Sequence, residues 1–181
     1  MAHRSDEIAR RVPHDREIKG VEVGVRYGKN AASLLHLLPN LELWMVDRWE
    51  KPPEGDSYYN SGDGVADRPV GHFLKCYHSA IERTAPYMHR RHVIQMDSIR
   101  AATFMRRSFG VIFDFVFIDA DHSYEGVRDD IEAWRPLVKP GGLLCGHDYG
   151  HPRIGEVKRA VDEAFGSQAE LGGDMCWFVK L

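Results

Sequence analysis

The segment from residue 19 to residue 30, KGVEVGVRYGKN, constrains the fold of this chain more than any other. Valine stands at every second position from 21 to 25, and this β-branched run without proline predicts a strand. Gly24 and Gly28 then interrupt the pattern just before an apolar stretch, residues 31–38, that predicts a helix. A glycine turn at such a junction lets the backbone approach a ligand closely and points the free N–H groups of the helix start toward it.

The spacing within this turn indicates the ligand. Dinucleotide-binding folds use G-x-G-x-x-G, whereas the pattern here is E-x-G-x-x-x-G, with Glu22 two residues before Gly24. A carboxylate at the end of the first strand would repel a pyrophosphate, but it would attract a ligand that carries an ammonium and a sulfonium group. S-adenosylmethionine (SAM) is such a ligand. The alternative interpretation of this motif alone is an ordinary strand-to-helix turn.

Size and composition favour one domain. With 181 residues and 43% hydrophobic content, the chain can build one well-packed core but not two ordinary ones. We therefore expect residues 1–181 to form a single domain, in which residues 1–17 are a helical cover on the sheet edge. The net charge of −3 argues against a nucleic-acid binder that depends on phosphate contacts.

The cysteines and the apolar runs indicate the compartment. Cys76, Cys145 and Cys176 are odd in number and widely spaced, which favours buried thiols in a reducing compartment over a disulfide framework or a zinc ribbon. No apolar run approaches the ~20 residues that span a bilayer, and the charged N-terminus lacks the apolar core of a signal peptide. We expect a cytoplasmic protein that does not bind membranes, and the sequence leaves a homo-oligomer open.

Two further predicted strands end in polar residues. Residues 41–46 precede Asp47, about 20 residues beyond the glycine turn, where an acid can hydrogen-bond the two hydroxyls of a ribose. A helix cap or turn aspartate is the alternative role. Residues 92–96 precede Asp97 and Ser98, which open a helix, and Asp97 can cap that helix, bind an adenine amino group, or do both.

Residues 50–71 have no helix or strand periodicity and are rich in Pro, Gly, Asp, Ser and Tyr. Loops of this length inside a domain are usually binding loops, lids or disordered insertions. The segment follows Asp47 closely and contains or adjoins Trp49, Tyr58 and Tyr59, which favours a substrate lid. A flexible surface insertion is the alternative.

A second group of polar residues follows two predicted strands in the C-terminal half of the chain. Residues 113–118 are apolar at almost every position, as a strand buried on both faces requires, and residues 143–146 are predicted to form the next strand. Ligands of open α/β sheets bind beyond the carboxyl ends of the strands, so we expect the residues after both strands to face the same cleft as Glu22 and Asp47. These residues are Asp119-Ala120-Asp121-His122 and His147-Asp148-Tyr149.

The remaining elements complete a fold prediction. Helices are predicted at 6–12 (capped by Ser5), 72–88, 124–134 and 156–165, the turn Lys139-Pro140-Gly141-Gly142 precedes the fifth strand, and a hairpin, 169–171 and 175–180, ends the chain. Five β-α units and a hairpin describe an α/β fold: a doubly wound, Rossmann-like, mostly parallel seven-stranded sheet with an antiparallel C-terminal edge strand.

On these motifs the chain resembles the class I SAM-dependent methyltransferases over residues 20–181. The glycine turn, Asp47, Asp97-Ser98 and the run 117–149, FIDADHSYEGVRDDIEAWRPLVKPGGLLCGHDY, follow that family's motifs in order. Within the class, the run is similar to the branch of catechol, macrolide-sugar and coumarin-antibiotic O-methyltransferases. The resemblance implies methyl transfer from SAM to a hydroxyl of a small-molecule acceptor. The cofactor-binding residues that we expect are Glu22, Gly24, Arg26, Gly28, Asn30, Asp47, Arg48, Asp97, Ser98 and Asp119.

The resemblance also raises the question of a metal. Those families hold a divalent metal with an acid after the fourth strand and two acid or amide residues after the fifth, which by position are Asp119, His147 and Asp148. His147 departs from this pattern, because magnesium prefers oxygen ligands, whereas imidazole suits zinc, iron or manganese better. The histidine therefore either changes the metal or means that no metal binds.

In-line methyl transfer needs a positioned hydroxyl and removal of its proton. His122 is the leading base, because it lies three residues past Asp119, where the catechol enzymes carry a basic residue, and imidazole titrates near working pH. His147 is second and His151 third, while a turn histidine at the start of the next helix is the alternative role for His122. The competing functions are an NAD(P)-type oxidoreductase, disfavoured by the missing G-x-G-x-x-G, and a non-catalytic SAM- or nucleotide-binding module.

Overall fold

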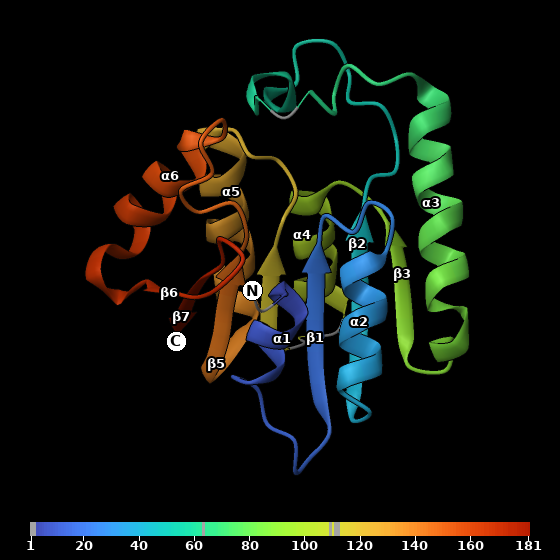
Figure 1. Ribbon diagram of the computed structural model, residues 1–181, viewed down its shortest axis with the longest axis vertical. Helices are drawn as coiled ribbons and strands as arrows, with labels where there is room; N and C mark the ends of the chain where they lie inside the picture. The colour runs from blue at the N-terminus through green and yellow to red at the C-terminus, as the bar shows by residue number, and fades with distance from the viewer. Residues whose placement is uncertain (1–2, 63, 109, 111–112) are drawn as a thin grey trace.

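A seven-stranded sheet runs through the centre of the computed structural model, which describes residues 3–62, 64–108, 110 and 113–181 (Figure 1). The strands are β1 (Ile18–Val23), β2 (Leu41–Asp47), β3 (Arg91–Gln95), β4 (Phe113–Ile118), β5 (Val138–Gly146), β6 (Glu170–Leu171) and β7 (Trp177–Lys180). Their order is β3-β2-β1-β4-β5-β7-β6, parallel from β3 to β5, with β7 antiparallel to both β5 and β6. The predicted doubly wound sheet with an antiparallel edge is confirmed.

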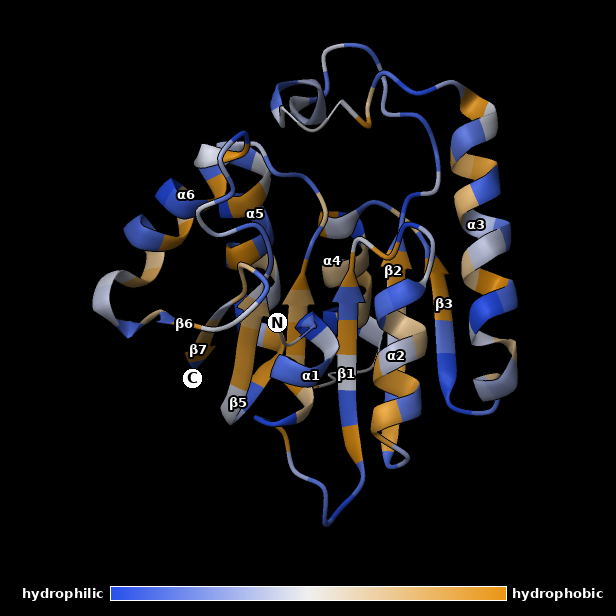
Figure 2. Cartoon of the chain, in the orientation of Figure 1, coloured by the Kyte–Doolittle hydropathy of each residue, from blue (hydrophilic) through white to orange (hydrophobic). Residues whose placement is uncertain are grey.

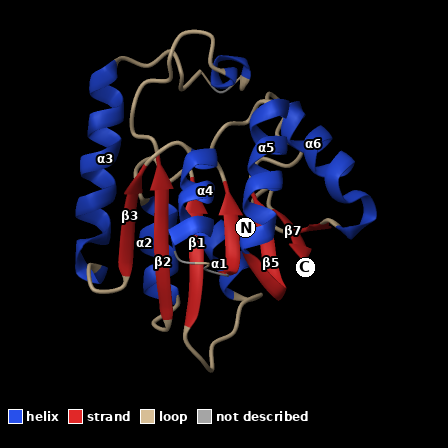
Figure 3. Ribbon diagram, turned by 180° about the vertical axis from the view of Figure 1, so that it is seen from behind, coloured by secondary structure: helices blue, strands red, loops and turns tan. Residues whose placement is uncertain are grey.

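Helices cover both faces of this sheet, and Figures 1 and 3 show the layers from opposite sides. The α-helices are α1 (Arg4–Ala9), α2 (Lys29–Leu37), α3 (Val70–Thr84), α4 (Ser98–Ser108), α5 (Tyr124–Trp134) and α6 (Gly155–Phe165). The 3-10 turns are η1 (Ser57–Asn60), η2 (Ala85–Tyr87), η3 (Arg135–Leu137) and η4 (Gly166–Gln168). Apolar residues of α4, α5 and α6 form one core cluster with the sheet, and those of α1, α2 and α3 form the other.

The central strand β4 separates the two clusters. Every residue of β4 is buried, with Val116 and Ile118 in the α4–α6 cluster and Phe115 and Phe117 in the α1–α3 cluster. A parallel strand between two helical layers must be apolar on both faces, which explains why its sequence does not alternate. Figure 2 shows β4 and β2 as predominantly hydrophobic bands beneath helices with mixed surfaces.

Several predicted boundaries are wrong: α3, for example, ends at Thr84 and not at residue 88. Three others have a clear local cause. β1 ends at Val23, because the N–H of Val25 turns away to the carboxylate of Asp47. β5 already begins at Val138, since the Lys-Pro-Gly-Gly segment continues the strand through an irregular register and exchanges backbone hydrogen bonds with Leu181. The first helix begins at Arg4 and is capped by His3 and Asp6 rather than by Ser5. Among the described residues, no helix is long and apolar enough to cross a membrane.

Candidate active site

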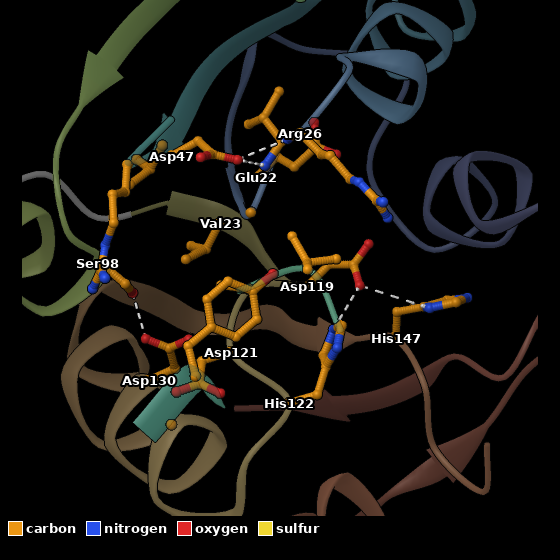
Figure 4. A pocket seen from close by; sticks show the side chains of 18 of the residues that line it. Glu22, Val23, Arg26, Asp47, Ser98, Asp119, Asp121, His122, Asp130 and His147 are labelled. Atoms are coloured by element: carbon orange, nitrogen blue, oxygen red, sulfur yellow. Dashed lines mark hydrogen bonds and ion pairs between the residues drawn. The ribbon is translucent and has the colours of Figure 1, made fainter. Parts of the chain in front are cut away.

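A cavity of about 870 Å³ opens at the carboxyl ends of the parallel strands. The strand order reverses between β1 and β4, and such a switch point is where open α/β sheets bind ligands. Most of the predicted site residues line this cavity, but Gly28 does not (Figure 4). Those that line it are Glu22, Gly24, Arg26, Asn30, Asp47, Arg48, Asp97, Ser98, Asp119, His122, His147, Asp148 and His151.

The two glycines of the first turn have different structural roles. Gly24 has a φ of +88°, and a Cβ there would lie 2.0 Å from the carbonyl oxygen of Asp119. Gly28, with a φ of +71°, has no room for a Cβ because the Cα of Ala80 on α3 would lie 2.7 Å away. Gly24 therefore brings the β1–α2 turn against the β4–α5 loop, while Gly28 brings α2 against α3.

Glu22 lies at the end of β1 with only 1% of its surface exposed. Its Oε1 accepts a hydrogen bond of 3.1 Å from Nδ2 of Asn30 on α2. Burial raises the pKa of Glu22 to about 8, although the hydrogen bond from Asn30 acts in the opposite direction. A buried carboxyl of this kind ionises when a cation, such as an ammonium group, arrives beside it.

Asp47 organises the turn beside Glu22. Its carboxylate accepts the backbone N–H groups of Val25 at 2.9 Å, Arg26 at 2.7 Å and Trp49 at 2.7 Å. Asp47 is therefore a turn aspartate, the alternative role that the sequence left open. Its carboxylate also lines the cavity, and its contact with a ribose stays a prediction.

Several residues other than glycine that have a left-handed backbone conformation, with positive φ, lie at the cavity. Arg26 at φ 50°, Trp49 at φ 44° and Asp148 at φ 61° all line it. Such conformations cost about 1–3 kcal/mol each, and they persist where surrounding contacts hold them, which is typical of functional sites.

The loop after β3 holds the opposite wall. Oδ1 of Asp97 accepts the N–H groups of Ile99 and Arg100, so the predicted cap of α4 is confirmed. Ser98 donates its hydroxyl to Asp130 and accepts a 2.9 Å hydrogen bond from Nε1 of Trp134.

Asp130, which the sequence analysis did not identify, is 3% exposed on α5, and burial raises its pKa to about 7. Nothing in its local sequence distinguishes it from the neighbouring surface acids. Only the packing of α5 against α4 brings it to the cavity wall.

The predicted lid contains more regular structure than expected, because η1 lies inside residues 50–71 and α3 already starts at Val70. Contacts made by Arg48 and Ser57 join this segment to the rim. Arg48 lies 2.8 Å from both Asp56 of the lid and Asp97. Ser57 donates its hydroxyl to Asp121 at 2.7 Å. Tyr58 lines the cavity as expected, while Tyr59 instead donates to the backbone of the lid.

The ends of β4 and β5 bring four polar side chains together, and Figure 4 labels Asp119, His122 and His147 among them. Nε2 of His122 lies 3.4 Å from Oδ1 of Asp119 and 3.2 Å from Oδ2 of Asp148. Nδ1 of His147 approaches the same two oxygens at 3.7 Å and 3.1 Å. Burial disfavours the charged form of Asp148, yet the neighbouring imidazoles of His147 and His122 lower its pKa overall. We call these four residues the acid–imidazole cluster.

Arg4 also reaches this cluster, although its segment, residues 1–17, is predicted only as a helical cover. Its Nη1 lies 2.5 Å from Oδ2 of Asp119, and both residues line the cavity. The two positions are 115 residues apart, and no local pattern connects them.

The sequence that builds this cavity matches a known protein family. Residues 21–149 match the family model described as a methyltransferase domain. The chain belongs to this family. It is a class I SAM-dependent methyltransferase, as the motifs at residues 20–181 predict.

Solved structures of other methyltransferases share the fold. CalS11, a calicheamicin methyltransferase, is 17% identical with a TM-score of 0.72, over 97% of this chain and 76% of that one. The O-methyltransferase NovP is 18% identical with a TM-score of 0.68, over 98% and 78%. An O-methyltransferase from Bacillus cereus, solved in complex with SAH, is 16% identical with a TM-score of 0.65, over 98% and 78%. No curated protein is significantly similar to this chain in sequence.

Proposed function

We propose that this methyltransferase transfers the methyl group of SAM to a hydroxyl oxygen of a small molecule, with His122 as the base. The observation that carries the proposal is an imidazole held between two carboxylates, Asp119 and Asp148, at the wall of the cavity. The O-methyltransferases among the similar structures support the choice of oxygen as the acceptor atom.

The cavity residues fit SAM in one orientation. Glu22 would pair with the ammonium group, Asp47 would receive the ribose hydroxyls, and the loop at Asp97 and Ser98 would hold the adenine. A volume of about 870 Å³ is within the usual range of about 300–1,000 Å³ for small-molecule sites. This orientation would put the reactive end of SAM at the junction of β1 and β4, beside Asp119.

SAM supplies a methyl group whose carbon passes from the sulfonium sulfur to the acceptor oxygen, while the electrons of the C–S bond stay on sulfur. His122 accepts the hydroxyl proton, and the carboxylates of Asp119 and Asp148, which lie beside its Nε2, stabilise the resulting imidazolium. The lid at residues 50–71 excludes water and selects the acceptor. Residues 1–181 act together as a single domain.

The same cluster contains donor groups that a divalent cation could use. Ligand atoms of Asp119, His122 and Asp148 all lie within 4.8 Å of one another. His147, which the resemblance implies as a ligand, faces the same carboxylates. Two carboxylates and an imidazole suit manganese, zinc or iron better than magnesium. When bound, such a metal would lower the pKa of the acceptor hydroxyl.

The test is tritium transfer from labelled SAM to a panel of hydroxyl-bearing small molecules, with and without chelator. Transfer to oxygen supports the proposal, and transfer only to nitrogen or carbon acceptors would contradict it. Calorimetry with SAM and NAD tests the cofactor separately. Tight binding of NAD, without binding of SAM, would contradict the assignment of the cavity as a SAM site. A protein that binds SAM without any transfer would instead be the non-catalytic module.

A further inference from the structure

Arg4 is held in place by the packing of its helix. α1 begins at Arg4, and a reciprocal cap between His3 and Asp6 closes its first turn. Ile8 is fully buried and belongs to the core cluster beneath α2, which anchors the helix to the sheet. The label N in Figure 1 marks this end of the chain beside β4. The position of the guanidinium is therefore set by a packed element.

The guanidinium contacts acids from two separate loops. Nη1 lies 2.5 Å from Oδ2 of Asp119, after β4. Nε lies 3.4 Å from Oδ2 of Asp174, in the turn between β6 and β7, and the backbone N–H of Arg4 donates to the same oxygen at 3.1 Å. The Arg4 and Asp119 side chains are only 24% and 16% exposed, so solvent screens their ion pair less than it would screen a surface pair.

The contacts of Arg4 affect whether a divalent cation can bind in the acid–imidazole cluster. A divalent cation in the acid–imidazole cluster needs the carboxylate of Asp119, and Arg4 already holds one oxygen of that carboxylate. A second cation beside the guanidinium would be repelled, because like charges in a partly buried site disfavour one another strongly.

We propose that Arg4 is the resident cation of this cluster: it neutralises Asp119 and keeps divalent metals from binding between Asp119 and Asp148. The inference rests on the proposed function, since it makes His122 the group that activates the acceptor hydroxyl. Arg4 is a positioning residue here, because it acts through Asp119 and sets which cation the cluster accepts.

The experiment measures the binding of Mn²⁺ alone, by the electron paramagnetic resonance signal of the free ion, to the full chain. The variants are Arg4→Gln, which removes the charge, and Arg4→Lys, which keeps it. Arg10→Gln is the matched control, because Arg10 is the C-cap of the same helix but pairs with Glu7 and is 64% exposed. Asp119→Asn in the Arg4→Gln background locates the ion.

Arg4→Gln is expected to bind Mn²⁺ at least about tenfold more tightly than the wild type, because a repelling charge is removed. Arg4→Lys and Arg10→Gln should stay near the wild type, and Asp119→Asn should abolish the gain. Equal affinity in Arg4→Gln and wild type, or a gain that survives Asp119→Asn, would overturn the proposal.

A second measurement does not depend on any variant. A crystal structure of the wild type in MnCl₂ should show Arg4 on Asp119 and no ion there, and an ion bound to Asp119 beside an unmoved Arg4 would overturn the proposal. The metal readouts need no acceptor, so they separate this inference from the proposed function. A chain that transfers no methyl group to hydroxyls yet gains Mn²⁺ affinity in Arg4→Gln refutes the acceptor class and supports the role of Arg4.

Discussion

At the scale of single residues, burial gives Glu22 a raised pKa of about 8, so its carboxyl keeps its proton in the folded chain where an unfolded chain has lost it. An unfolded glutamate titrates near ~4.3. Between these two values the folded state binds more protons than the unfolded state, so stability falls as pH rises, by up to ~1.4 kcal/mol per pH unit. Below the lower value both states are protonated and the effect vanishes.

Glu22→Gln should therefore remove the loss of stability that the wild type shows as the pH rises. We expect the melting temperature of the variant, relative to the wild type, to increase steadily from pH 5 to about 8. Thermal unfolding followed by circular dichroism measures it, with the exposed Glu17→Gln as the control. Parallel curves for Glu22→Gln and wild type would show that the carboxyl is already ionised.

The proposed role of His122 as the base can be tested by substitution. His122→Ala should lower the rate of methyl transfer by ~10²–10⁴-fold, because the hydroxyl loses its proton acceptor. Binding of SAH should change little, since His122 contacts Asp119 and Asp148 rather than the turn at Glu22. His78→Ala, exposed on α3, is the control. Unchanged turnover in both His122→Ala and His147→Ala would remove these imidazoles from the mechanism.

At the scale of elements, the lid buries Val65 and Ala66, but none of its described residues belongs to either core cluster. Arg48 with Asp56 and Ser57 with Asp121 hold η1 to the rim. Amide hydrogens in residues 50–71 should exchange faster than those of β4, and should slow when SAH and an acceptor bind.

Arg48→Met should speed exchange in the lid and leave β4 unchanged, as hydrogen exchange with mass spectrometry would show. Arg128→Met, at an exposed pair on α5, is the matched control. Equal protection of the lid and β4 in the free protein would contradict this account.

Elements that carry their own signal could be predicted from sequence. The bounds of β4 and α5 agree with the prediction, because an unbroken apolar run and a capped amphipathic stretch are local features. β5 begins earlier than predicted because the backbone of Gly141 pairs with Leu181, and sequence does not show such a partner. The same limit applies to the site, where strand ends located Asp119 and Asp148 but nothing local located Arg4.

At the scale of the whole molecule, both halves of the sheet wall the cavity, so a ligand that spans it should stabilise the entire fold. SAH at one hundred times its dissociation constant should add ~2.7 kcal/mol to the free energy of unfolding. For a chain of this size, that corresponds to a rise of about 5–10 °C in melting temperature. NAD at the same concentration serves as the control, and an equal rise with NAD would contradict the cofactor assignment.

The contact between Arg4 and Asp174 joins positions 170 residues apart. During synthesis on the ribosome, α1 is therefore exposed long before the turn between β6 and β7 has been made. Until that turn emerges, Arg4 lacks one of its two acids and β5 lacks its antiparallel neighbour. Because domains fold as units while the chain is extended, a nascent chain that has not reached Asp174 cannot yet hold Arg4 through both of its acids.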